Sequence, residues 1–436
     1  MATNLDGRTS AAAPATLISG ARYATGPRTA ARGSLQIAGE RLQRVYTEAA
    51  VLPTSASRID LEGFLLLPGL INAHDHLQYA LHPRLGNPPY RNYVEWGGDI
   101  HATLPSVISY YKSVPKDVRL WWGGIRNLLC GVTTVCHHDP LWPALHAEGY
   151  PIKVLRNYGW AHSVRLAPNI REAWTGTAKD CAFFVHACEG TDELAGRELA
   201  ELDRLGMLDA KTVIIHGLAL DERGTTLLQE RQASLIVCPS SNQFLYDTLP
   251  DMNLLSTVKK IALGNDSPLT AAGDLLDEVR FAIEHASIPT DDAYRMITDL
   301  SAGILRLAEG EGYIRESGCA DLIAVRDNGE PPCKRLLTLS WRDVEFVMIA
   351  GEVRLASEEV CPLLPPMATH GMEPLSIDGC IRWLRAPVRQ LVQQAEAVLG
   401  AGRVRLGERV VQLADPIIPL ASSVACQAQP WVEERA

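Results

Sequence analysis

Two histidines, His74 and His76, are the residues best placed for chemistry. They close a run that starts at Phe64 and is almost entirely apolar. Such a run predicts a buried strand, in which residues two apart point to the same face, so the two imidazoles would converge on one point. Neutral imidazole is a good ligand for zinc, and a catalytic zinc site keeps one position open for water. Because histidines also close surface strands, the pair by itself is only a hypothesis.

Four further segments share this design, an apolar run that ends in a chemically capable residue. They are residues 182–189, 212–216, 233–239 and 261–268, which carry His186 and Glu189, His216, Cys238 and Asp266. Helix-like stretches at 192–205 and 221–231 lie between them, and strands that alternate with helices predict βαβ units and a parallel sheet. In a (β/α)8 barrel the carboxyl ends of the strands meet at one mouth, so we expect these residues to form one site.

The order of these motifs resembles that of the amidohydrolase superfamily. The matching residues are 68–76 (PGLINAHDH), 186–189 (HACE), 216–217 (HG), 238–242 (CPSSN) and 264–268 (GNDSP). More narrowly, the chain is similar to the branch that contains guanine deaminase, adenosylhomocysteine deaminase and the triazine hydrolases. The resemblance extends from about residue 15 to about residue 355. Five motifs in the same order are far more specific than any one of them.

The resemblance implies an α/β fold, a (β/α)8 TIM barrel with a small β-sandwich domain formed from both chain ends. It also implies a site with one divalent metal ion, zinc, with iron as the alternative. The implied metal ligands are His74, His76, His186 and Asp266. The implied catalytic residues are Asp266, which takes a proton from the attacking water, Glu189, which delivers protons to the substrate, and His216. The sequence leaves open whether His216 contacts the water or binds the metal.

The chain departs from the family pattern around the fourth barrel strand. Binuclear members carry a bridging lysine there, whereas the stretch between Tyr158 and His186 offers only Lys179, in a polar segment without strand character. We therefore expect a mononuclear site. The same stretch is short for a strand and a helix, so we expect a reduced fourth unit.

Three residues are candidates for substrate contacts. His138 belongs to a His-Asp run after the second expected strand, Trp96 stands in a long segment after the first, and Asn242 follows Cys238. His138 would donate to a substrate carbonyl, Trp96 would stack on a planar ring, and Asn242 would orient the substrate. Each also has a structural interpretation: a packed loop histidine, part of a satellite core, or a residue that holds a turn.

The expected domains follow from the barrel motifs. Residues 67–312 would form the barrel, residues 1–66 and 313–360 the two parts of the β-sandwich, and residues 361–436 a C-terminal helical extension. Gly351 would make a hairpin turn in the second part. The extension would contain one amphipathic helix over 377–399, with packing or oligomer contact as its use.

Composition limits the partners. The chain has 436 residues, a formal net charge of -10 and no basic cluster, which argues against a nucleic-acid partner. It lacks both a signal-peptide pattern at its start and an apolar run long enough to span a membrane, so we expect a cytoplasmic protein. Its ten cysteines have no metal-site spacing and predict reduced, mostly buried thiols. The expected partner is a small heterocyclic substrate, with a homo-oligomer left open.

Three functions fit these motifs. The first is deamination of an aminated heterocycle or cyclic amidine, such as a purine, pterin or triazine-like ring, because Glu189 supplies the proton that departing ammonia needs. The second is a hydrolase of the same fold that cleaves an amide or releases a halide. The third is a non-catalytic binding protein that a metal stabilises. Intact Asp266 and Glu189 argue against the third, since a pure binder uses neither.

Overall fold

The computed structural model describes residues 15–48, 50–53, 56–271 and 273–414. The start of the expected first domain, residues 1–14, and the end of the expected extension, residues 415–436, therefore lie outside the described residues. The helices are α1 (Tyr93–Thr103), α2 (Pro105–Lys112), α3 (Lys116–Leu129), α4 (Ile170–Gly176), α5 (Glu193–Arg204), α6 (Glu222–Glu230), α7 (Pro239–Tyr246), α8 (Met252–Leu255), α9 (Leu275–His285), α10 (Thr290–Met296), α11 (Asp299–Ile304), α12 (Pro332–Leu337), α13 (Pro366–Thr369) and α14 (Val388–Leu399).

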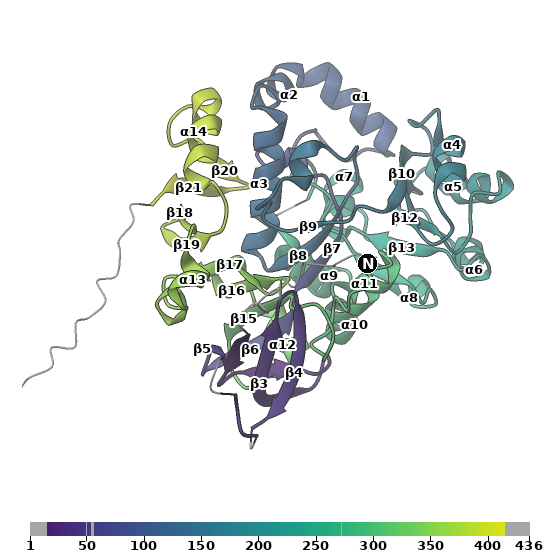
Figure 1. Ribbon diagram of the computed structural model, residues 1–436. Helices are drawn as coiled ribbons and strands as arrows, with labels where there is room; N and C mark the ends of the chain where they lie inside the picture. Colours follow the sequence, from purple (N-terminus) through teal and green to yellow (C-terminus); the bar gives the residue numbers. More distant parts are fainter. Residues whose placement is uncertain (1–14, 49, 54–55, 272, 415–436) are drawn as a thin grey trace, which may run out of the picture.

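Parallel strands carry the chemically capable residues. One sheet contains β7 (Leu70–Asp75), β8 (Val132–His137) and β9 (Lys153–Val154), and a second contains β10 (Tyr158–Ser163), β11 (Ala182–Ala187), β12 (Thr212–His216), β13 (Ser234–Val237) and β14 (Ile261–Leu263). Every neighbouring pair in both sheets is parallel. The apolar runs that predicted these strands are buried along their length, as expected where helices cover a parallel sheet (Figure 1).

The two parallel sheets approach each other at both ends. A parallel bridge joins Asp75, the last residue of β7, to Asp266, which follows β14. At the other junction the amide of Leu155 donates to the carbonyl of Val135 at 2.9 Å, so pairing with β8 continues to within three residues of β10. Residues 155–157 between β9 and β10 contain no helix. The strands therefore follow one another in chain order, and the unit between β9 and β10 is the shortened one. The expected reduction of the next unit is wrong, because the stretch from Tyr158 to His186 contains both strand β10 and helix α4.

The lysine expected of binuclear relatives has no counterpart here. Lys179 lies in the turn before β11, at the opposite end of that strand from His186. Strand β10 contains no lysine. This arrangement agrees with the expectation that Lys179 does not bridge two ions.

Strands from both ends of the chain join in one large sheet. Its N-terminal strands are β1 (Thr16–Ser19), β2 (Arg22–Ala24), β3 (Ala30–Ala38), β4 (Arg41–Thr47), β5 (Ser57–Asp60) and β6 (Phe64–Pro68), and its next strands are β15 (Leu322–Arg326), β16 (Val344–Ile349) and β17 (Glu352–Ser357). β6 and β15 pair antiparallel and connect the two sets. Ala350 and Gly351, both with positive φ, turn the chain between β16 and β17, as the sequence predicted for Gly351.

The expectation of one helix over 377–399 is wrong for its first half. The helix α14 begins only at Val388, and before it β18 (Glu373–Ile377) and β19 (Cys380–Leu384) form an antiparallel hairpin. Asp378 and Gly379 have φ values of 47° and 80°, the conformation of a tight hairpin turn. The short strands β20 (Arg405–Leu406) and β21 (Arg409–Leu413) follow, so the extension continues the large sheet and is not simply helical.

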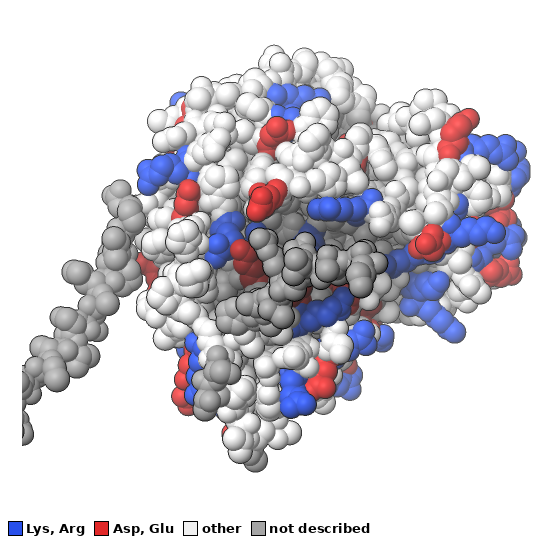
Figure 2. Space-filling view, in the orientation of Figure 1, with Lys and Arg blue, Asp and Glu red and all other residues white. Residues whose placement is uncertain are grey.

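Three further observations concern membrane-spanning helices, surface charge and the cysteines. No helix within the described ranges combines the length and apolar character needed to cross a membrane. On the face drawn in Figure 2, basic and acidic side chains are interspersed. The nine cysteines in the described part of the chain are all unpaired thiols.

Candidate metal centre

The candidate ligands meet where the parallel strands end. His74 lies on β7 and His76 just after it, His186 lies on β11, and Asp266 follows β14. All four are at most 9% exposed. The four residues that the sequence predicted as metal ligands therefore come together, because the carboxyl ends of neighbouring parallel strands share one edge.

The separations between donor atoms suit a metal ion. His74 Nε2 lies 3.2 Å from His186 Nε2 and 3.5 Å from Asp266 Oδ1, and His76 Nε2 lies 3.7 Å from the same carboxylate oxygen. Two ligand atoms bound at about 2.1 Å to a tetrahedral zinc ion lie roughly 3.4 Å apart. The donor set of imidazoles and one carboxylate is also one that zinc and iron accept.

Each of three imidazoles is held by one ring nitrogen, which leaves the other free. His76 Nδ1 donates to Asp139 Oδ2 at 2.7 Å, and His216 Nδ1 donates to Asn242 Oδ1 at 2.9 Å. His186 Nδ1 donates to a backbone carbonyl, that of His162. Such contacts fix the ring orientation and tautomer of metal-binding histidines.

Burial and the nearby carboxylates determine the pKa values of the histidines in the cluster. Burial lowers the pKa of His74 to about 4, even though Asp266 opposes the shift, and it lowers the pKa of His186 well below the usual value. These two rings are therefore neutral and can offer lone pairs. Burial also acts against the charged form of His76, but Asp139 and Asp266 outweigh it and raise the pKa to about 9. A metal ion has to displace that proton, so metal binding at His76 is pH-dependent.

The backbone conformation of Asp266 and hydrogen bonds from two hydroxyl groups orient its carboxylate. Its φ of 54° is a left-handed conformation that turns the side chain toward the cluster. Ser241 Oγ and Thr270 Oγ1 each donate to its Oδ2 at 2.7 Å, which leaves Oδ1 facing the histidines. Burial opposes ionisation, yet the hydrogen bond from His74 and the nearby histidines hold the pKa of Asp266 below its usual range.

Glu189 lies beside this cluster, and its pKa is shifted in the opposite direction from that of Asp266. Its Oε2 lies 3.7 Å from His216 Nε2, and Tyr246 donates to its Oε1 at 2.8 Å. Burial raises the pKa of Glu189, although His216 and the tyrosine act in the other direction. Two carboxyl groups in one site are thus driven apart in pKa, a pattern typical of paired acid and base catalysts.

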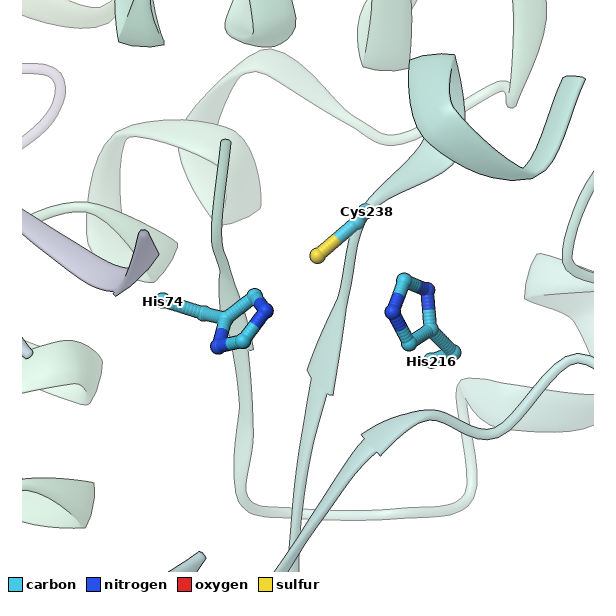
Figure 3. A group of neighbouring side chains, drawn as sticks. All are labelled: His74, His216 and Cys238. Carbon is cyan, nitrogen blue, oxygen red and sulfur yellow. The ribbon is translucent and has the colours of Figure 1, made fainter. Parts of the chain in front are cut away.

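Cys238 is a neighbour that the sequence did not predict as a ligand. Its Sγ and one nitrogen each of His74 and His216 lie within 4.8 Å of one another, and Figure 3 shows all three side chains pointing into a common space. Burial raises the pKa of Cys238 well above its usual value, so its thiol stays protonated. Cys238 is fully buried and is not among the residues that line the cavity in front of the cluster.

A cavity of about 200 Å³ opens in front of the cluster. Its walls combine the polar groups of the site with apolar and aromatic residues, namely Tyr79, Tyr93, Trp96, Ile100, Leu166, Leu245 and Leu269. Trp96 Nε1 donates to the carbonyl of Leu85 at 2.9 Å, so the indole offers only apolar surface to the cavity. Trp96 thus lines the cavity, and its stacking on a substrate ring stays a prediction.

Two predicted substrate contacts lie elsewhere. Asn242 is buried and holds His216, and His138 is buried with Nε2 hydrogen-bonded to the carbonyl of Ala161 at 2.9 Å. Neither is among the residues that line the cavity. The expectation that His138 and Asn242 touch substrate is therefore not met, because both side chains are buried outside the cavity wall, where His138 Nε2 and Asn242 Oδ1 bind residues of neighbouring elements.

Three residues of the site were missed by the sequence analysis. Asp139 holds His76, Tyr246 holds Glu189, and His162 lines the cavity from β10. Asp139 directly follows the histidine pair that ends β8, which was a usable signal. No pattern in the sequence distinguishes Tyr246 or His162 from other residues on their elements.

Fold and site together define a metal-dependent hydrolase built on parallel βα units. A family model described as the amidohydrolase family matches residues 169–354. A 5-methylthioadenosine/S-adenosylhomocysteine deaminase of Natronomonas pharaonis is 26% identical over 371 residues, which cover 69% of this chain and 84% of the relative. These matches support the resemblance to the amidohydrolase superfamily that the motifs indicated.

Solved structures agree on the fold. An adenosine deaminase from Xanthomonas campestris with bound zinc matches with a TM-score of 0.63 and 18% identity, over 88% of this chain and 97% of that one. The atrazine chlorohydrolase of Arthrobacter aurescens in complex with zinc matches with a TM-score of 0.67 and 15% identity, over 88% and 99% of the two chains. At these identities the likeness shows a shared fold.

Proposed function

We propose that this protein deaminates an aminated heterocycle or cyclic amidine by hydrolysis, using one divalent metal ion. The observation that carries the proposal is the pairing of a buried, ionised Asp266 with a buried Glu189 of raised pKa at the edge of one small cavity. Loss of ammonia needs both a base for water and an acid for the leaving group. The deaminase names of relatives such as that of Natronomonas pharaonis support this reaction class.

The residues present fit a metal ion, and we assign His74, His76, His186 and Asp266 as its ligands. Their donor atoms have separations that suit one ion, with His74 Nε2 3.2 Å from His186 Nε2 and 3.5 Å from Asp266 Oδ1. A divalent ion bound here lowers the pKa of a water molecule and so supplies a nucleophile near neutral pH. We propose zinc, with iron as the alternative, on the basis of the donor set.

The protein groups divide the proton transfers between them. Asp266 accepts a proton from the attacking water, and Glu189 delivers a proton to the ring nitrogen next to the attacked carbon. The carbon–oxygen bond forms as the carbon–nitrogen double bond of the ring opens. Glu189 then passes the proton of the new hydroxyl to the amino group, and ammonia leaves as its bond to carbon breaks and the carbonyl forms. The proton held by Asp266 finally returns to Glu189, which restores both carboxyl groups. His216, 3.7 Å from Glu189 Oε2, faces the space where the attacking oxygen would lie. Trp96 would stack on the ring of the substrate.

We also propose how the units assemble. The parallel strands from β7 to β14 would close into the barrel of the superfamily, with the shortened unit at β9 and β10, and residues 67–312 would form that domain. Residues 1–66 and 313–360 would form the flanking β domain, which the β6–β15 pairing supports. The matches to two solved structures over 88% of the chain support this assembly.

The test is the identity of the released group. The metal-loaded protein is incubated with a panel of aminated purines, pterins and triazines, their chlorinated analogues and simple amides, while ammonia, chloride and carboxylate are measured. The proposal predicts ammonia from at least one aminated ring. Chloride or carboxylate as the only product would instead identify a hydrolase with another leaving group.

A further inference from the structure

We infer that His138 is a further ligand of the same metal ion, binding through Nδ1. The inference rests on the metal site of the proposed function and adds a residue that directly follows β8, a strand that supplies none of the four ligands assigned above. It also gives His138 a role in place of the substrate contact that the structure does not support.

The tautomer of His138 leaves the correct nitrogen free. Nε2 lies 2.9 Å from the carbonyl oxygen of Ala161, and since a carbonyl only accepts, the proton of the ring sits on Nε2. Nδ1 then carries a lone pair. It is buried and has no hydrogen-bond partner among the described residues. A carbonyl tether on one nitrogen with the other left bare is the arrangement that metal-binding histidines show.

The ring of His138 also lies close to two of the assigned ligands. One nitrogen each of His74, His138 and His186 lie within 4.8 Å of one another. The ring centroids of His138 and His186 are 4.3 Å apart, and those of His138 and His74 are 5.2 Å apart. His74 also belongs to the group formed with His76 and Asp266. His74 is therefore common to the group that contains His138 and to the group that contains Asp266.

The backbone fixes His138 against the first ligand strand. Its amide donates to the carbonyl of Asp75 at 3.0 Å, and Asp75 lies between His74 and His76. The side chain is fully buried and does not line the cavity. A buried imidazole that is held through Nε2 and whose Nδ1 has no partner among the described residues is suited to bind an ion.

His162 offers a matched comparison. It lies on the neighbouring strand β10 and its ring centroid is 5.5 Å from that of His186, yet it belongs to none of the ligand groups. Its Nδ1 lies 3.1 Å from Ser163 Oγ, and its contact with His186 uses the backbone carbonyl, which a substitution preserves. His162→Gln therefore changes a nearby imidazole without removing a proposed ligand.

The experiment compares metal binding in three proteins. Zinc affinity of the wild type, His138→Gln and His162→Gln is measured by competition with a chelator, and X-ray absorption counts the imidazoles around the ion. His138→Gln should lose at least about tenfold in affinity and one imidazole from the count, since even residues that only orient ligands contribute ~10–100-fold. His162→Gln should stay within about twofold of the wild type on the same scale. An unchanged count and affinity in His138→Gln would overturn the assignment.

A second measurement covers the case in which His138→Gln does not fold. In crystals of the zinc-loaded wild type, the anomalous signal locates the ion directly. Nδ1 of His138 at about 2.0–2.2 Å from it supports the inference, whereas a separation beyond roughly 3 Å refutes it. Neither readout depends on turnover. If the ion is bound by His138 but no substrate releases ammonia, the proposed function fails while the ligand assignment stands.

Discussion

At the scale of single residues, Glu189 decides between the functions that the motifs allow. It is buried, it accepts a hydrogen bond from Tyr246 and it lies near His216, so it is held where a proton could pass to a bound ring. It does not belong to any group of neighbouring side chains that could hold an ion. Its role is therefore separable from metal binding.

We predict that Glu189→Gln lowers turnover of an aminated substrate by ~10²–10⁴-fold, because the amide keeps the shape but cannot cycle a proton. Metal content, measured by elemental analysis, should stay at about one ion per chain, as in the wild type. Loss of the ion would mean that Glu189 is a ligand. Turnover close to that of the wild type would mean that the leaving group departs without its help, as a halide does.

The chemically capable residues at strand ends could be predicted because the end of a strand is visible in the residues directly next to it in the sequence. The runs before His74, His186, His216 and Asp266 are apolar and short, and the carboxyl ends of parallel strands share one edge. The partners of Asn242 and His138 could not be predicted in the same way. Their hydrogen bonds go to residues 26 and 23 positions away, on other elements, and nothing in their own neighbourhood encodes that pairing.

At the scale of elements, a buried glutamate connects the helices behind the site. Glu278 on α9 accepts hydrogen bonds from the backbone and the hydroxyl of Ser240 at the start of α7, and Ser241, the next residue, donates to Asp266. Glu278 is fully buried, and burial raises its pKa to about 7. The charged form is therefore disfavoured in the folded protein, and the stability should depend on pH.

The direction of the pH dependence of the free energy of unfolding follows from proton uptake by Glu278. Because the folded state holds the proton more tightly than the unfolded state, Glu278 favours folding below its unfolded pKa of about 4.3, and this contribution is lost as the pH rises to about 7. Glu278→Gln should therefore remove a pH-dependent difference of up to ~3 kcal/mol in the free energy of unfolding, measured in urea at pH 4.5 and 7.5. Substitution of the exposed Glu230 by Gln is the control. A profile shared by all three proteins would show that Glu278 does not titrate in this range.

Elements at the C-terminal end show where pattern reading fails. Trp383, Val388, Leu391 and Leu399 stand near helical spacing, yet the first belongs to strand β19 and the others to α14. From the spacing alone, the strand and the helix are predicted as one helix. The Asp378-Gly379 turn and Pro387 mark the boundary, because positive φ angles favour the turn and proline begins a helix more readily than it continues one.

At the scale of the whole molecule, a charge cluster connects the parallel strands to the large sheet. Lys153 of β9 lies 2.9 Å from Glu311 and 2.5 Å from Asp321, which directly precedes β15. The two acids are almost fully buried, whereas the lysine is partly exposed. Asp321 also accepts the amide of Ala350 in the hairpin turn. The ammonium group thus neutralises two carboxylates at the boundary between the sheets.

We predict that Lys153→Met lowers the free energy of unfolding by ~3 kcal/mol, because it leaves buried carboxylates without a counter-charge. Lys334→Met, at an exposed pair 3.9 Å from Glu330, should change it by less than ~1 kcal/mol. Urea denaturation followed by circular dichroism measures both. Equal effects of the two substitutions would mean that the cluster does not stabilise the boundary.

The central claim is that water replaces an amino group on a ring carbon in this site. The most direct measurement is turnover of an aminated heterocycle in water enriched in the heavy isotope of oxygen, with mass spectrometry of the product and an assay for ammonia. We predict one heavy oxygen on the ring carbon that lost nitrogen and one ammonia for each product, with both signals lost after chelation of the metal. A product without the label, or ammonia that does not match product, would contradict hydrolytic deamination.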